Sequence, residues 1–67
     1  MIKVFVKNDS DKRTWLEIGT FDSNKARIAV VQETNRALSP NEWNQSISLL
    51  KGKKSVMPRL GVKIQLA

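Results

Sequence analysis

Cysteine and histidine are absent from this chain of 67 residues, and only six acidic side chains are present. Without these residues the chain has neither a disulfide nor the usual ligands of a zinc site. The same absences remove most of the acid–base and nucleophilic arrangements that enzymes use. We therefore expect a protein that is not an enzyme and that has no cofactor and no metal site.

Glycine is scarce, and long apolar runs are missing. Gly19, Gly52 and Gly61 are too scattered to form a phosphate-binding loop. No stretch approaches the roughly 20 apolar residues of a membrane span, and residues 1–7 alternate apolar with basic side chains, unlike a signal peptide. Because zero cysteine also fits a reducing compartment, these features predict a cytoplasmic protein with no membrane partner.

Acidic side chains are few, and none follows Glu42. Asp9 and Asp11 form the only close pair, and they offer too few oxygen ligands for a divalent cation. We interpret them as part of a solvated turn between two strands.

Basic side chains dominate, since twelve Lys and Arg residues give a formal net charge of +6. Residues 51–63 carry five of them and no acid, a pattern typical of segments that bind polyanions. Nucleic acid, DNA or RNA, is the favoured partner, and an acidic protein surface and plain solubility are the alternatives. The candidate nucleic-acid-binding residues are Lys51, Lys53, Lys54, Arg59 and Lys63, with Lys3, Lys7, Arg13 and Trp15 from the N-terminal part.

Some of these residues also have ordinary explanations. Lys51, Lys53 and Lys54 follow an expected helix end, where cations offset the helix dipole. Trp15 and Phe5 are candidates for a stacking platform of the kind that holds single strands, but either ring could instead pack beneath the helices. The alternation of side chains along the strands does not decide between these two positions of the rings, because both faces of the expected hairpin contain large apolar residues.

The N-terminal part predicts a β-hairpin. Residues 2–7 place Ile2, Val4 and Val6 on one face, which is the period-two pattern of a half-buried strand. Residues 14–21 form the second strand after a polar turn. Simple alternation puts the following side chains of this second strand on one face: Trp15, Glu17, Gly19 and Phe21.

The middle of the chain predicts two helices. Residues 24–38 follow a capping Asp22 and contain many helix formers, although a β-branched cluster leaves a third strand as the alternative. Ser39 and Pro40 begin a clearer helix that ends near Gly52. Its outward residues Asn41, Asn44, Gln45 and Ser48 could also belong to a helix-turn-helix, but no basic residue precedes Lys51 on this helix, and an αα-hairpin on a sheet explains the same residues.

Two segments resemble known DNA-binding families. Residues 15–23, with Ala26 and Ala29 beyond them, resemble the plant ethylene-response-factor DNA-binding domain, which implies a three-stranded sheet backed by a helix. Residues 37–43 are similar to the strand-to-helix step of the transcriptional-coactivator single-strand-binding family. That second resemblance implies a strand at residues 26–32.

The expected fold is one α+β domain spanning residues 1–67. Residues 53–58 are expected to form a loop and residues 62–66 a strand beside residues 2–7, giving the order β-β-α-α-β. This is a three-stranded antiparallel sheet with two helices packed on one face. A chain this short gains only about 3–5 kcal/mol from its core, so a homodimer or stabilisation by a partner is also expected.

Overall fold

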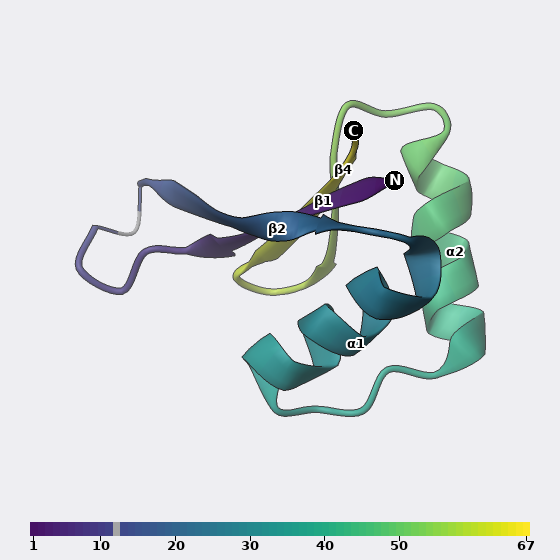
Figure 1. Ribbon diagram of the computed structural model, residues 1–67, viewed down its shortest axis with the longest axis horizontal. Helices are drawn as coiled ribbons and strands as arrows, with labels where there is room; N and C mark the ends of the chain where they lie inside the picture. The colour runs from purple at the N-terminus through teal and green to yellow at the C-terminus, as the bar shows by residue number, and fades with distance from the viewer. Residues whose placement is uncertain (12) are drawn as a thin grey trace.

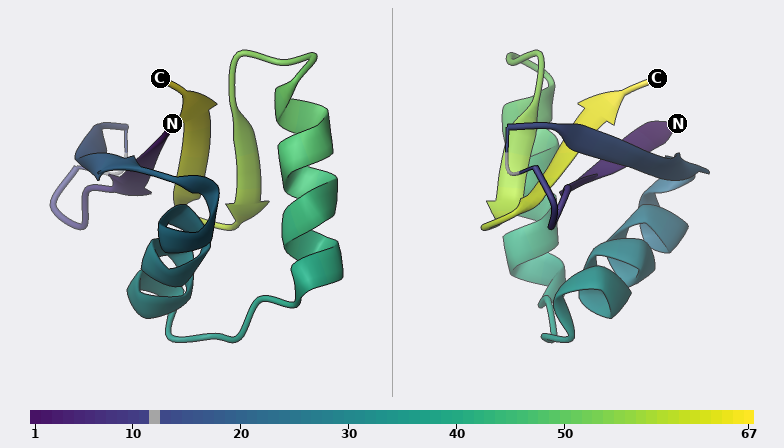
Figure 2. Two further views of the ribbon diagram at one scale, coloured as in Figure 1. Left: turned by 45° about the vertical axis from the view of Figure 1, so that its right-hand side comes forward. Right: turned by 90° about the vertical axis from the view of Figure 1, so that its left-hand side faces the viewer.

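The computed structural model describes residues 1–11 and 13–67 as an antiparallel sheet with two helices on one of its faces (Figure 1, Figure 2). The strand order in the sheet is β2-β1-β4-β3. The elements are β1 (Ile2–Lys7), β2 (Trp15–Phe21), α1 (Ser23–Thr34), α2 (Pro40–Leu50), β3 (Val56–Arg59) and β4 (Val62–Leu66). The predicted α+β class with two helices is confirmed, but the predicted three strands are wrong, because the chain has four in the order β-β-α-α-β-β.

The additional strand is β3, whose first three residues fall within the segment 53–58 that was expected to be a loop. Pro58 removes one backbone donor, so this strand belongs at an edge of the sheet, and among the described strands it pairs only with β4. Leu60 and Gly61 connect the two strands, and Gly61 has the positive φ of 84° that a tight turn requires. Strand β4 lies beside β1, as predicted.

The first helix settles the main ambiguity of the sequence in favour of helix over strand. The Asp22 carboxylate accepts a hydrogen bond from the amide of Lys25 at 2.9 Å and caps α1. Asn35 ends the helix in the left-handed conformation at φ 53°. The strand at residues 26–32 implied by the coactivator resemblance is therefore wrong, because these residues lie within α1.

The second helix begins as predicted. The Ser39 hydroxyl accepts a hydrogen bond from the amide of Glu42 at 3.2 Å, and Pro40 occupies the first helical position. Trp43 is buried, and its indole N–H donates to the Ser23 hydroxyl of α1 at 3.0 Å. This bond joins α2 to the first residue of α1.

The core lies between the helices and the inner face of the two central strands. It is formed by side chains with almost no exposure: Ile2, Val4, Ala26, Val30, Leu38, Trp43, Leu50, Val62 and Ile64. In α1 the buried residues are two alanines and Val30, whereas Ile28 is 46% exposed. Small side chains on the inner stripe let this helix lie close to the sheet.

A β-bulge in β2 changes the faces that simple alternation predicts. Val4 pairs with Gly19 and Phe5 with Glu17, so Ile18 is an extra residue between these pairs. Beyond the bulge, Phe21 lies on the helix side and packs against the core. The prediction that Phe21 shares a face with Trp15 is therefore wrong.

Candidate nucleic-acid interface

The sheet face opposite the helices carries two aromatic rings and three lysines, Lys3, Phe5, Lys7, Trp15 and Lys63, which we call the aromatic face. The Lys63 ammonium lies 5.0 Å from the centre of the Phe5 ring and 4.8 Å from that of Trp15. The Lys7 ammonium lies 4.5 Å from the Trp15 ring. Each distance is within the range of a cation–π interaction, so three strands contribute to one cluster.

Strand register explains why these side chains meet. Directly opposed residues of an antiparallel pair project to the same side of the sheet, and Phe5 is opposite Lys63 on β4 while Lys7 is opposite Trp15 on β2. Lys3 is two residues from Phe5 and therefore shares its face. Both rings are half-buried, so they are accessible only in part.

Glu17 adds a negative charge to this face. It is opposite Phe5 on the edge strand β2 and is exposed. An anion would therefore meet lysines along β1 and β4 but repulsion at β2. The charge distribution therefore favours an anion that lies over the central strands β1 and β4.

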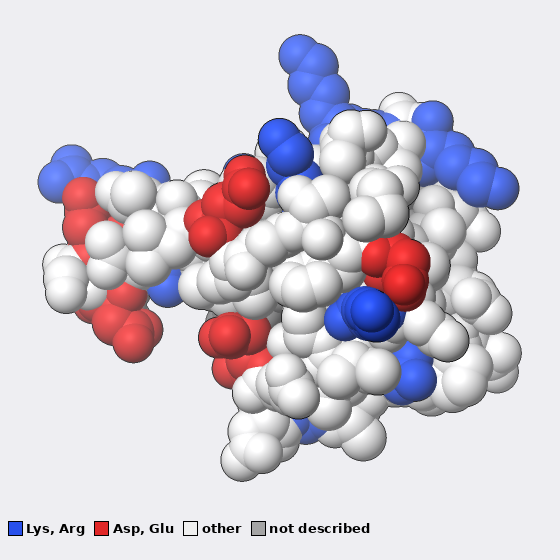
Figure 3. Space-filling view, in the orientation of Figure 1, with Lys and Arg blue, Asp and Glu red and all other residues white. Residues whose placement is uncertain are grey.

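The lysine loop, which consists of Lys51, Lys53 and Lys54, lies apart from the rings. All three lysines are exposed. In Figure 3, basic side chains extend from the end of the molecule where the connection from α2 to β3 lies in Figure 1. Because β3 begins opposite Ile64 of β4, the loop lies at the Lys3 end of the sheet.

Arg59 does not join these lysines, because it points to the helix side of the sheet. Its guanidinium donates to the Ala37 carbonyl and lies 3.3 Å from the Glu42 carboxylate, and its side chain is only 14% exposed. Arg27 donates to the neighbouring Leu38 carbonyl at 3.5 Å. Both arginines hold the connection between the helices, which gives Arg59 a structural role.

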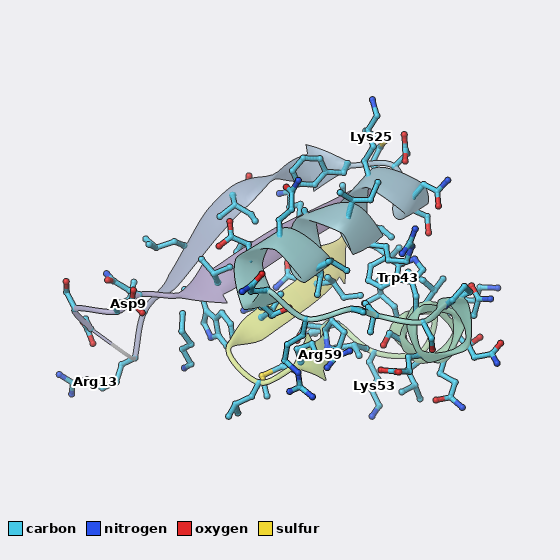
Figure 4. All side chains as sticks on the ribbon, turned by 90° about the horizontal axis from the view of Figure 1, so that it is seen from below. Asp9, Arg13, Lys25, Trp43, Lys53 and Arg59 are labelled. Atoms are coloured by element: carbon cyan, nitrogen blue, oxygen red, sulfur yellow. The ribbon has the colours of Figure 1, made fainter. Side chains whose placement is uncertain are left out.

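Arg13 lies far from the lysine loop, in the loop between β1 and β2 (Figure 4). It is 94% exposed, and its guanidinium is 3.7 Å from the Asp11 carboxylate. This carboxylate accepts hydrogen bonds from the Arg13 amide and the Thr14 hydroxyl. These bonds lower the pKa of Asp11. Asp9 and Asp11 thus lie in an exposed turn, in agreement with their interpretation as a solvated pair.

The site residues inferred from sequence fall into four places. Lys3, Lys7, Trp15 and Lys63 come together on the aromatic face. The lysine loop adjoins one end of it, Arg13 lies near the other end, and Arg59 is on the far side. The role of Glu17 was missed, although alternation along residues 14–21 already placed it on the face of Trp15; the pairing of β1 with β2 adds that it is opposite Phe5.

No protein-family model, curated protein or solved structure matches this chain. Neither family resemblance is therefore supported by a match over the chain. Within residues 1–11 and 13–67, the two helices are too short to cross a membrane.

Proposed function

We propose that this chain is a small non-enzymatic nucleic-acid-binding or regulatory protein whose aromatic face is the binding surface. One observation carries the proposal: the Lys63 ammonium lies within 5.0 Å of the centres of two aromatic rings, on the sheet face that the helices leave open. Aromatic rings interleaved with basic side chains form the usual platform for a nucleic-acid strand.

The charges on this face support a phosphate-binding role. Lys7 and Lys63 are held near the rings, and Lys3 lies roughly 13 Å from Lys7 along β1 at 3.3 Å per residue. The lysine loop adds three exposed lysines at the Lys3 end of the sheet. Arg59 is not part of the surface, because it is bound to the connection between the helices.

A salt titration with labelled oligonucleotides tests the proposal by fluorescence anisotropy. For three phosphate contacts with a single strand, affinity should fall about 20-fold between 50 and 200 mM salt. Undetectable binding to both a single strand and a duplex at the lower salt concentration would overturn the proposal.

A pair of charge-matched double variants locates the site. Lys7→Met with Lys63→Met should weaken binding at least tenfold at about 50 mM salt, because two phosphate contacts are lost. Lys25→Met with Arg36→Met removes the same charge from exposed positions in and just after α1, and should change affinity less than threefold. Equal losses from both variants would place the binding outside the aromatic face.

The lysine loop is tested separately. Lys53→Glu with Lys54→Glu should weaken binding if the nucleic acid extends past Lys3, and both side chains are exposed, so the fold should be retained. Unchanged binding would restrict the site to the sheet.

A second candidate function is a protein-interaction module or inhibitor that binds an acidic partner. The outer face of α2 favours it, because this face is uncharged and leads directly into the lysine loop; its residues are Asn41, Asn44, Gln45, Ser48 and Leu49. Protein interfaces are depleted of charge at their centres. A pull-down from nuclease-treated lysate should then retain a stoichiometric protein that the Lys53→Glu, Lys54→Glu variant loses, and an empty lane would count against this function.

A further inference from the structure

The aromatic face has a property that distinguishes between kinds of nucleic acid, because its rings are already covered in the unbound protein. The Lys63 ammonium lies over both Phe5 and Trp15, and the Lys7 ammonium lies over Trp15 as well. A base can stack on these rings only where an ammonium group has moved away.

We propose that the aromatic face binds single-stranded nucleic acid by an exchange, in which unpaired bases replace Lys63 on the ring of Phe5 and both Lys63 and Lys7 on the ring of Trp15, and the displaced ammonium groups contact phosphate. This inference rests on the proposed function and adds the class of ligand. In this exchange Lys63 has two positions: it lies over the rings in the unbound protein and contacts a phosphate in the complex.

The exchange is favourable because stacking of a base on a ring is a stronger contact than the cation–π interaction that it replaces. A cation–π interaction at an exposed site changes an equilibrium by about two- to fivefold, whereas stacking of one base on an aromatic side chain is worth about 5- to 150-fold. The lysine stem has four flexible carbons and a compact charge. Lys63 can therefore leave the rings without any backbone movement.

The ligand must have unpaired bases because the two rings lie on a sheet surface and can meet only the flat face of a base. In a duplex these faces are occupied by neighbouring base pairs. Reading a duplex groove would instead require hydrogen-bonding side chains directed at base edges, and the phenyl ring of Phe5 has no hydrogen-bonding group. The surface therefore favours a single strand.

Glu17 indicates how the strand would lie. It repels phosphate at the β2 edge, whereas Lys63 on β4 attracts it from the other side of Phe5. The phosphate backbone is thus expected over β4, with bases directed toward Phe5 and Trp15.

The first experiment compares an oligothymidine of about 12 nucleotides, within the usual range of site sizes, with a duplex of equal length. We expect at least tenfold tighter binding of the single strand at about 50 mM salt and quenching of Trp15 fluorescence. Trp43 is only 4% exposed and gives a constant background. Equal affinity for both ligands would overturn the single-strand inference but leave the proposed function intact, whereas no binding to either would overturn both.

The second experiment separates stacking from charge. Trp15→Leu should weaken binding of the single strand about 5- to 150-fold with an unchanged salt dependence, because no phosphate contact is lost. A Trp15→Leu variant that binds as tightly as the wild type would exclude stacking. Urea unfolding of each variant confirms that the fold is retained.

The third experiment tests the two positions of Lys63. Lys63→Met should weaken binding at low salt and make the slope of log affinity against log salt shallower by about 0.7, the value for one lost phosphate contact with a single strand. If Lys63 only covered the rings, Lys63→Met would instead strengthen binding and leave the slope unchanged. That result would overturn the exchange.

Discussion

The contact between Gly19 and Phe21 predicts a large effect from adding a single methyl group. A Cβ atom at Gly19 would lie 2.7 Å from Cζ of the Phe21 ring, and the residue has a φ of 153°. Such a distance is too short for two carbon atoms, so the ring would have to leave its place against the core. Overpacking of this kind costs about 1–3 kcal/mol.

The cost is large relative to the whole stability of about 3–5 kcal/mol expected for so small a core. With a urea m-value of about 1 kcal/mol/M, Gly19→Ala should lower the unfolding midpoint by about 1–3 M. The measurement is a urea titration followed by far-ultraviolet circular dichroism.

Gly52 supplies the matched control, because a Cβ atom there meets no other atom within 4 Å. Gly52→Ala should leave stability unchanged or raise it by up to about 1 kcal/mol, through the unfolded chain. Combining Gly19→Ala with Phe21→Leu should cost less than the two separate changes together, since the smaller side chain relieves the contact. A Gly19→Ala midpoint within about 0.5 M of the wild type would refute the reasoning.

Three further predictions concern single side chains. Arg59→Ala should lower the free energy of unfolding by about 1.5–3 kcal/mol, measured by urea titration, because a buried charged donor to the helix connection is lost. The bonds from Arg13 and Thr14 lower the pKa of Asp11 below its ordinary 3.8, so its contribution to stability is present above that pH and is lost as pH falls through the folded pKa. Thermal melts of Asp11→Asn should therefore show a smaller loss of stability below about pH 4 than the wild type. Glu17→Gln should raise affinity for a single strand about two- to threefold in anisotropy titrations, since an acid roughly 7 Å from a phosphate costs about 0.6 kcal/mol in water.

Local sequence patterns were sufficient to predict the elements whose formation depends on residues close together in the chain. Residues 2–7 alternate in the way a half-buried strand requires, and the capping side chains of Asp22 and Ser39 mark the first turns of the two helices. Trp43 is one helical turn from Ile47, a spacing typical of a core-facing stripe, and it is buried. In each case the deciding interactions lie within a few residues along the chain.

The sequence by itself therefore determined the α+β class, the helix starts and the excess of basic residues. Only the tertiary structure decided the fourth strand, the bulge in β2 and the separation of Arg59 from Lys63. Strand pairing brings Lys63 onto Phe5 and Trp15 from the other end of the chain, and the bulge turns Phe21 inward while leaving Trp15 outside. These features depend on register between distant strands, which no local pattern of side chains specifies.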